Sequence, residues 1–448
     1  MITLDVRNAF NSARWDLIIQ TLLSIGVPNY LTEIINNYLS NRYLRYSTSD
    51  IPKTYKICAG VSQGSVLGPL LWNIMYDKVL MLDIPEEATI IGFADDIAVI
   101  VTGRYLDEIE LIANEVAHTI SEWMKNAGLE LAEQKTEAVL ITSRRKRETI
   151  KIQVGRYEVE SKPSLKYLGV IIDARLNYAA HIEYVCQKAS NVRIAIERMM
   201  PNVGGPKQMK RRLISTVIRS LILYGAPIWS EALKTKYIAK KLLSVYRLCA
   251  LRICSSYRTT SDDAAHVIAG IIPIDIMADE SKRLFDRKIR GEENTNMIRK
   301  IERERSMRLW QDRWNESTKA RWTYKLIPHI EEWISRKYGE VNYYLTQFLS
   351  GHGGYRKYLH RFGLDDSPIC PRCPNVTEDP EHVIFRCPRF EAERQSAELT
   401  VGLEINPDNI INIMTTRKEN WIEICSMIAH IHKELRKEED IRKQNRSI

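Results

Sequence analysis

The chain contains 448 residues, of which 44% are hydrophobic and 27% are charged, and its formal net charge is +9. This composition is ordinary for a globular protein, and the length allows two or three domains with buried cores. Eight cysteines are too few for a disulfide scaffold, and the first residues do not show a signal-peptide pattern. The excess of basic residues fits a protein that binds a polyanion. It fits a basic enzyme that binds no polyanion equally well.

The longest apolar stretch, residues 66–82, is interrupted by Asn73, Asp77 and Lys78, so it does not suit a membrane span. We therefore expect an intracellular protein that is not embedded in a membrane. Five cysteines are scattered along the chain, and three gather with a histidine between residues 370 and 387. That grouping favours a metal site in a reducing compartment.

The first part of the chain mixes predicted strands and helices. In chain order, the pattern predicts a strand at residues 2–6, helical spacing over 17–39, a long helix over 66–82, a hairpin with arms at 90–93 and 97–100, an amphipathic helix over 106–128, and strands at 138–142 and 165–172. Helices and strands that share one sheet predict an α+β domain over residues 1–175.

From about residue 179 the apolar spacing becomes helical. Four tryptophans occur in a charge-rich stretch, and we favour a buried core for them over a stacking platform for nucleic acid: Trp310, Trp314, Trp322 and Trp333. Residues 421–435 carry one apolar helical stripe, and the charged last dozen residues are expected to fray.

Acidic residues stand at two points of the predicted sheet. Asp5 follows a strand, and Asp95 and Asp96 occupy the tip of the hairpin. Either site alone is ordinary, because aspartate is common in turns. The apolar residues on both sides of the pair predict a buried hairpin whose carboxylates require a cation, and oxygen ligands suit Mg²⁺ better than zinc.

A glycine-rich segment lies between these acidic sites. Residues 60–68 include Gln63, Gly64 and Ser65 and lead directly into the helix predicted from residue 66. Such a loop lets the backbone approach a ligand closely at a helix N-terminus. A tight turn before a core helix explains the same residues about as well.

Cys370, Cys373, His382 and Cys387 have the spacing of a structural zinc site. Four ligands within so short a segment make free thiols the weaker interpretation. Because the segment is small, we expect metal binding rather than burial to stabilise its fold.

Several of these segments resemble the conserved motifs of reverse transcriptases, and they occur in the same order. Residues 4–13, 63–65 and 93–96 are similar to motifs A, B and C, while residues 133–137 and 166–170 are similar to motifs D and E. The residues of these motifs are most similar to those of non-LTR, LINE-like elements, in particular the type-1 elements of arthropod ribosomal RNA genes.

The resemblance implies an arrangement of domains. It would comprise a right-hand polymerase palm without its fingers at 1–175, a helical thumb at 176–270, a basic Trp/Arg-rich helical region at 271–362, a CCHC zinc knuckle at 363–395 and a helical tail at 396–448. Because the chain starts almost at motif A, we expect this fragment alone to polymerise weakly or not at all.

It also implies roles for individual residues. Asp5 and Asp95, assisted by Asp96, would hold two Mg²⁺ ions, and one structural Zn²⁺ would bind the Cys/His cluster. The other assignments are Phe10 as the steric gate against ribose, Gln63, Gly64 and Ser65 as nucleotide and template contacts, Lys135 as general acid, and Tyr167, Leu168 and Gly169 as primer grip. A surface lysine and a core strand explain Lys135 and the primer-grip residues nearly as well.

The partners implied are an RNA template, a DNA primer or target (ribosomal DNA), and dNTPs, at a nuclear site of integration. Arg361, Arg372, Arg386 and Arg389 would give the knuckle its charge for nucleic acid, and the parent polyprotein would also carry an endonuclease. Two alternatives remain: a catalytically incomplete nucleic-acid-binding remnant, and an RNA-directed RNA polymerase, against which Phe10 and residues 94–96 argue.

Overall fold

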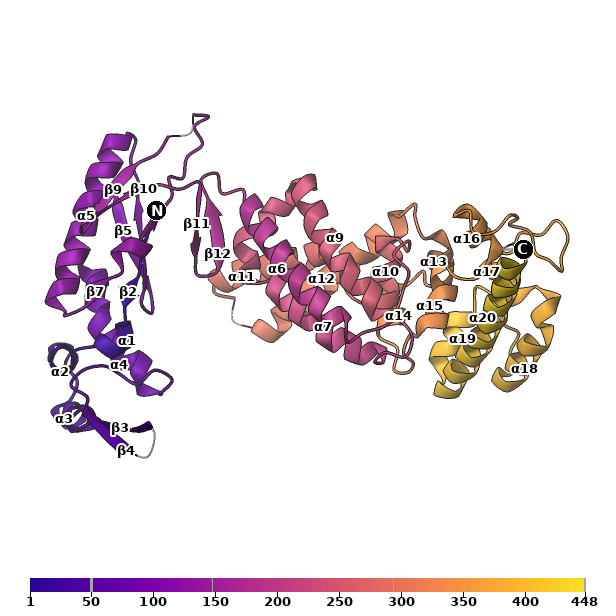
Figure 1. Cartoon of the computed structure of the whole chain (residues 1–448), viewed down its shortest axis with the longest axis horizontal. Helices are drawn as coiled ribbons and strands as arrows, with labels where there is room; N and C mark the ends of the chain where they lie inside the picture. The colour runs from indigo at the N-terminus through magenta and orange to yellow at the C-terminus, as the bar shows by residue number, and fades with distance from the viewer. Residues whose placement is uncertain (49–50, 147, 293, 447–448) are drawn as a thin grey trace. The chain divides into compact units, whose positions relative to one another are not determined.

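The computed structural model describes residues 1–48, 51–146, 148–292 and 294–446. It divides the chain into two compact units, Met1–Ala180 and His181–Ile448, which we call unit 1 and unit 2. Unit 1 holds the strands and unit 2 is helical, as the colours of Figure 1 show along the chain. The finer division of unit 2 into thumb, basic region, knuckle and tail stays a prediction.

The centre of unit 1 is a four-stranded antiparallel sheet with the order β5-β6-β1-β8. Its strands are β5 (Ala88–Phe93), β6 (Asp96–Val101), β1 (Ile2–Leu4) and β8 (Glu137–Ala138). The predicted hairpin and first strand are therefore confirmed, and the register pairs Leu4 with Ile97. Since β1 lies between β6 and β8, the start of the chain is held in the middle of the sheet.

One long helix, α5 (Leu106–Asn126), packs beside this sheet and against β9 (Figure 1). Its buried residues recur at every fourth position, at Ile112, Val116, Ile120 and Met124, as an amphipathic helix requires. Gly128 follows in the left-handed region, with φ of 71°, and the helix stops there as predicted.

The other elements of unit 1 surround this core. They are β2 (Val6–Arg7), α1 (Ala9–Ser12), α2 (Trp15–Ser24), α3 (Asn29–Leu39), β3 (Tyr43–Thr48), β4 (Ile51–Lys56), α4 (Leu67–Tyr76), the 3-10 helices η1 (Asp77–Met81) and η2 (Glu133–Lys135), β7 (Glu130–Leu131), β9 (Lys151–Val154), β10 (Tyr157–Glu160), β11 (Ser164–Tyr167) and β12 (Val170–Asp173).

Four expectations for unit 1 need correction. The helical stretch 17–39 is two helices, because Gly26 (φ 79°) and Pro28 interrupt it. The helix predicted to reach residue 82 ends at Tyr76 and continues as a 3-10 turn. The strand predicted over 165–172 is the β11–β12 hairpin. The acidic hairpin is only partly buried, because β5 is an edge strand of the sheet and Phe93 is 61% exposed.

Unit 2 is built from helices connected by short turns. They are α6 (Ala179–Glu197), α7 (Gln208–Ile222), α8 (Ala226–Trp229), η3 (Ser230–Lys234), α9 (Lys236–Ile253), α10 (Asp262–Ala269), α11 (Ile274–Ile289), α12 (Thr295–Glu316), α13 (Arg321–Leu326), α14 (Ile330–Ile334), α15 (Tyr343–Ser350), α16 (Arg356–Arg361), α17 (Pro380–Phe385), η4 (Pro388–Phe390), α18 (Glu391–Val401), α19 (Ile410–Thr416) and α20 (Lys418–Arg446).

No single helix of the described chain is long and apolar enough to cross a membrane, although the bent pair Gln208–Ile222 and Ala226–Lys234 passes the same test of length and composition.

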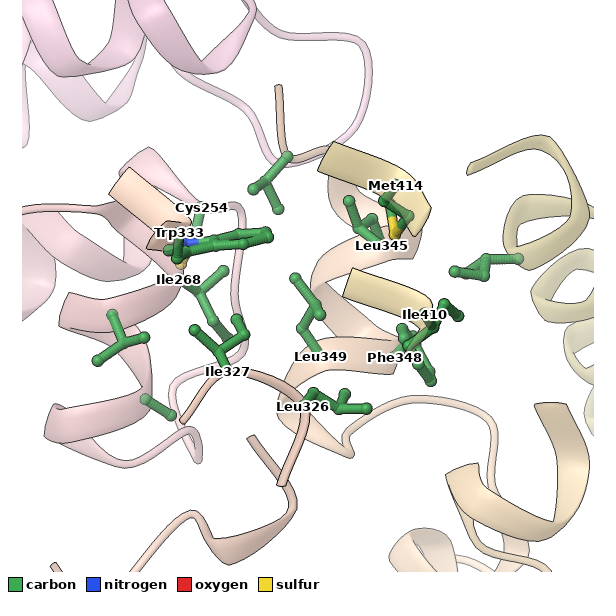
Figure 2. Close-up of a cluster of buried hydrophobic side chains, with 14 of the residues drawn as sticks. Cys254, Ile268, Leu326, Ile327, Trp333, Leu345, Phe348, Leu349, Ile410 and Met414 are labelled. Atoms are coloured by element: carbon green, nitrogen blue, oxygen red, sulfur yellow. The ribbon is translucent and has the colours of Figure 1, made fainter. Parts of the chain in front are cut away.

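A single hydrophobic cluster joins most of unit 2, with members from Ala250 to Leu435. Figure 2 shows side chains from distant segments meeting in it, among them Cys254, Trp333, Phe348 and Met414. The preference for buried tryptophans is confirmed at Trp310, Trp314 and Trp333. Trp322 is partly buried against the same cluster, and its indole N–H donates to the Phe348 carbonyl over 2.7 Å.

The C-terminal helix α20 carries the predicted apolar stripe and packs against α15, α18 and α19. Ile424, Ile428, Ile431 and Leu435 are fully buried. Of the last dozen residues, those up to Arg446 continue α20, and Arg442 forms ion pairs with Glu438 in the same helix and with Asp365 outside it. Residues 447–448 lie outside the described chain, and fraying stays a prediction. Charged residues at this helix end bind other charged residues of unit 2 instead of lying free in water.

Glu302 of α12 is a buried carboxylate that binds two guanidinium groups of α11. It accepts hydrogen bonds from Arg283 and pairs with Arg287 at 3.0 Å, while Arg283 also donates to Ser306. Glu302 is 1% exposed. A buried charge costs free energy unless partners of opposite charge satisfy it, so these ion pairs define how α11 and α12 pack.

We predict that Glu302→Ala lowers the free energy of unfolding by about 3–5 kcal/mol, because Arg283 and Arg287 lose the buried carboxylate that they share and keep only the more exposed Asp279 and Glu292. Urea unfolding followed by circular dichroism measures this loss. Glu304→Ala is the matched control, since Glu304 is exposed on the same helix, and it should change stability by less than about 0.5 kcal/mol. Equal midpoints for the two variants would contradict the prediction.

Candidate active site and metal cluster

The strand register brings the three predicted catalytic aspartates together. Leu4 pairs with Ile97, so Asp5, the next residue of the chain, lies opposite Asp96. Directly opposed residues of antiparallel strands have Cα atoms about 4.5–5.5 Å apart. Asp95 lies in the turn beside Asp96, and the convergence expected for the three carboxylates is therefore present. Their role in metal binding stays a prediction.

The mutual repulsion of these carboxylates acts on the pKa of Asp96 and on that of the neighbouring Tyr76. Partial burial, followed by the negative charges of Asp95 and Asp5, raises the pKa of Asp96 above its ordinary value. Burial raises the pKa of Tyr76 strongly, and the charges of all three aspartates add to that shift. The acidic site thus holds excess negative charge, which is the environment in which a bound cation is most stabilising.

Lys135 reaches this site from η2. Its Nζ donates to Asp5 Oδ2 over 2.8 Å, and this hydrogen bond together with the charge of Asp5 raises the pKa of Lys135. The backbone supports the approach, because Ala132 N–H donates to the Asp5 carbonyl. The predicted general acid therefore lies beside the first predicted metal ligand, in a pair whose lysine is mostly exposed.

The glycine-rich loop is fastened to helix α1 by its backbone. Gly60 N–H donates to the Ala13 carbonyl and Val61 N–H to the Phe10 carbonyl, each over 2.7 Å. At Gly68, which begins the buried face of α4, an added Cβ would lie 2.2 Å from the Ser62 carbonyl oxygen. The loop therefore turns tightly into α4, and it is held next to the segment that carries Phe10.

The predicted nucleotide contacts in this loop differ from one another. Gln63 and Gly64 are exposed, and Gly64 has φ of 84°, a value that favours glycine. The Ser65 hydroxyl is already used locally, because it donates to the Ser62 carbonyl over 2.8 Å and accepts from Gly68 N–H over 2.9 Å. In this arrangement the Ser65 side chain caps the start of α4, while the Gln63 side chain is exposed to solvent.

Phe10, the predicted steric gate, lies on α1 and is partly buried. Its ring stacks on Trp72 of α4 with 5.4 Å between the ring centroids. Helix α4 runs from the glycine-rich loop, so the gate, the loop and the acidic hairpin all border the same helix. Sequence reasoning assigned no role to Trp72 or Tyr76, and only their four-residue spacing on a helix after a glycine loop could have indicated one.

The predicted primer grip is the turn of the β11–β12 hairpin. Leu168 and Gly169 have φ of 45° and 83°, so the backbone reverses between Tyr167 and Val170. The Tyr167 hydroxyl is buried and has no hydrogen-bond partner in the described part of the chain. Burial and the charge of Asp96 raise its pKa, which places this tyrosine near the acidic site.

A second site lies in unit 2, where Cys370, Cys373, His382 and Cys387 converge. One ligand atom from each lies within 4.8 Å of all the others. Helix α17 positions His382, because its N-cap Asp379 accepts from the His382 backbone N–H. His382 Nε2 is buried without a hydrogen-bond partner in the residues described. Three sulfurs and one unpartnered imidazole nitrogen fit the donor set of a structural zinc ion.

This cluster is not an independent module. Cys370 and Cys387 belong to the main hydrophobic cluster of unit 2, together with Val383, Ile384 and Phe390. The expectation that burial contributes nothing to this segment is therefore wrong, because its apolar residues pack into the core of unit 2.

The arginines near the cluster fall into two groups, those with internal contacts and those exposed to solvent. Arg389 is enclosed: it donates to Cys387 Sγ over 3.4 Å and forms ion pairs with Glu378 and Glu438. It is thus committed to internal contacts and is not available to nucleic acid, contrary to expectation. Arg361 and Arg372 are exposed, and exposed Arg386 pairs with Glu381.

Comparison with known proteins gives a consistent result. Residues 1–172 match the family described as "Reverse transcriptase (RNA-dependent DNA polymerase)". The chain is 26% identical over 392 residues to a Pol polyprotein from type-1 retrotransposable element R1 2 of Nasonia vitripennis, covering 82% of this chain and 95% of that one. It is 24% identical over 410 residues to the R1 Pol polyprotein of Bradysia coprophila, covering 87% of this chain but 40% of that relative.

Among solved structures, the chain is similar to a telomerase from Candida tropicalis bound to a fragment of telomeric RNA. The TM-score is 0.31 and the identity 11%, over 67% of this chain and 48% of that one. The assignment therefore rests on the family match and on the R1 relatives, with which the order of motifs agrees. Residues 1–172 form a reverse transcriptase domain, and over most of its length the chain is similar to Pol polyproteins of R1-like, non-LTR elements.

Proposed function

We propose that the acidic site of unit 1 binds two Mg²⁺ ions and adds deoxynucleotides to a DNA primer on an RNA template. The observation that supports this proposal is the convergence of Asp5 with Asp95 and Asp96 through the pairing of β1 with β6. Two ions about 4 Å apart are the usual complement of such a carboxylate group. When bound, they would lower the pKa of the primer 3′-hydroxyl and neutralise charge on the triphosphate.

The protein side chains would act as follows. Asp5 and Asp95 would hold the ions, and Asp96 would assist from the neighbouring position. Lys135, whose Nζ donates to Asp5, would supply a proton to the leaving pyrophosphate. Phe10 would exclude a ribose 2′-hydroxyl by its ring, which Trp72 holds in place by stacking. Tyr167, near Asp96, would contact the primer end.

The wider setting is also a proposal. R1 elements appear in the names of the relatives, and we propose that this chain copies an element transcript from a primer in nicked target DNA, in the nucleus and at ribosomal DNA. The Bradysia polyprotein is longer than this chain, and the parent polyprotein would carry an endonuclease that makes the nick. These statements rest on the resemblance to R1-type elements.

We predict that the chain extends an oligo(dT) primer on poly(rA) weakly and only with a divalent cation, and that Asp95→Asn reduces extension at least about 100-fold. Removal of one metal-binding carboxylate weakens the stabilisation of charge in the transition state. Gel analysis of labelled primer measures the product. The matched control is Asp83→Asn, an exposed aspartate of unit 1 with no ion pair in the described chain.

If the Asp95→Asn variant extends the primer as well as the Asp83→Asn variant does, the proposed site is contradicted. Absence of extension from the unchanged protein would favour the nucleic-acid-binding remnant. Incorporation of ribonucleotides in preference to deoxynucleotides would favour an RNA-directed RNA polymerase.

We further propose that Cys370, Cys373, His382 and Cys387 bind one Zn²⁺ ion that stabilises unit 2. The support is the mutual distance of their ligand atoms and the unpartnered His382 Nε2 in the described structure. Arg389 would offset negative charge on the Cys387 thiolate, to which it already donates. Through Glu438 the same guanidinium connects the ligand segment to α20. The exposed Arg361 and Arg372 would be the positions at which this region contacts nucleic acid.

We predict one equivalent of zinc per chain, and its loss in Cys373→Ser when a competing chelator is present. Cys373 is the least buried of the three thiols, so its replacement disturbs packing least. Chelation should lower the Tm of the unchanged protein, by about 2–4 °C for each kcal/mol lost, and leave the Tm of Cys373→Ser unaffected. Elemental analysis and differential scanning calorimetry make the two measurements.

Cys58→Ser is the control, because Cys58 is an exposed cysteine of unit 1. It should retain zinc and respond to chelation as the unchanged protein does. A protein purified without zinc that is as stable as the zinc-loaded form would rule out the proposed site.

A further inference from the structure

Two aromatic residues of α4 contact the turn that carries the acidic pair. Trp72 Nε1–H donates to the Ala94 carbonyl over 3.0 Å, and the Tyr76 hydroxyl donates to the Asp95 carbonyl over 3.4 Å. Both carbonyls belong to the tight turn between β5 and β6. The turn is therefore held at its backbone by a neighbouring helix, and among the described residues neither the Asp95 nor the Asp96 carboxylate has a side-chain hydrogen bond or ion pair.

This turn needs such support for two reasons. Ala94 has φ of 54°, a left-handed conformation that costs free energy in a residue other than glycine. The carboxylates of Asp95 and Asp96 also repel each other and that of Asp5, because the strand register and the turn bring three like charges close together. Phe93, at the end of β5, is exposed and gives the turn little packing. Hydrogen bonds from α4 oppose both effects.

The hydrogen bond from Trp72 to the turn also satisfies a donor that is buried inside the protein. It is 0% exposed, so its N–H would remain unsatisfied inside the protein without the Ala94 carbonyl. Its ring lies between Phe10 and Tyr76, with centroid distances of 5.4 and 4.6 Å. One side chain thus contacts the ring predicted to select the sugar and the backbone of the turn that carries the acidic pair.

We propose that Trp72 is a positioning residue for the polymerase reaction: its indole N–H orients the Asp95–Asp96 turn for divalent-cation binding, while its ring places Phe10. This inference rests on the proposed metal-binding function of the acidic site. It goes further, because it separates two contributions of one side chain, a hydrogen bond that acts on metal affinity and a ring surface that acts on sugar selection.

The test removes the hydrogen bond and keeps the ring. Incorporation of L-3-benzothienylalanine at position 72 replaces the N–H by sulfur with almost unchanged shape. Mn²⁺ replaces Mg²⁺ as the probe, and its binding to the full chain is titrated by electron paramagnetic resonance. The dissociation constant should rise roughly two- to tenfold, the equivalent of one lost hydrogen bond. Tyr76→Phe should give a smaller rise, because its hydrogen bond is longer.

The matched control places the same analogue at position 123. Trp123 also contacts Tyr76, with 6.0 Å between ring centroids, but its N–H has no hydrogen bond in the described structure. Its replacement should leave Mn²⁺ binding unchanged. Urea unfolding curves should show that every variant is fully folded under the conditions of the titration, which separates orientation of the turn from general loss of the fold.

The outcomes distinguish a failure of the proposed role of Trp72 from a failure of the proposed metal site. If the unchanged protein binds Mn²⁺ and Asp95→Asn does not, while the analogue at position 72 binds as tightly as the unchanged protein, the role of Trp72 is refuted and the metal site stands. If Asp95→Asn and the unchanged protein bind Mn²⁺ equally, the proposed metal site fails and the role of Trp72 fails with it.

Discussion

The repulsion among three carboxylates is the constraint on which the organisation of unit 1 depends. Asp5, Asp95 and Asp96 would separate if each were free, and partial burial adds to the cost of their charges. The β1–β6 register keeps Asp5 opposite Asp96, and hydrogen bonds from α4 hold the backbone of the turn that carries the acidic pair. A site held against its own repulsion gains stability when a cation binds, which is the property that a two-metal polymerase uses.

Unit 2 handles charge in a different way. Its buried carboxylates each have guanidinium partners, as Glu302 has on α11 and Glu378 has in Arg389. Arg389 also contacts Cys387 and Glu438, so one side chain connects the Cys/His cluster with α20. Compensated charges of this kind fasten segments to a common core. Unit 1 thus leaves negative charge available for ligands, and unit 2 pairs its buried carboxylates internally.

Local patterns predicted the elements well where one periodicity dominated, as in α5 and the stripe on α20. They failed where the outcome depended on a neighbour. The β5–β6 hairpin looked buried because both arms are apolar, yet in the described chain β5 is an edge strand of its sheet. Residues 165–172 looked like one strand because Leu168 gives no sign of its left-handed turn. The charged residues near the end of α20 looked fully solvated, whereas Arg442 pairs with Asp365.

Residue type and spacing were enough to predict the carboxylates, thiols and imidazole of the two candidate sites and the order of the reverse transcriptase motifs, because the chain carries those features directly. Which side chains support the two sites follows only from how the chain folds. The contact of Trp72 with Ala94 and that of Arg389 with Glu438 join residues 22 and 49 positions apart. Contacts of that kind arise from packing between elements, and no local pattern of residues specifies them.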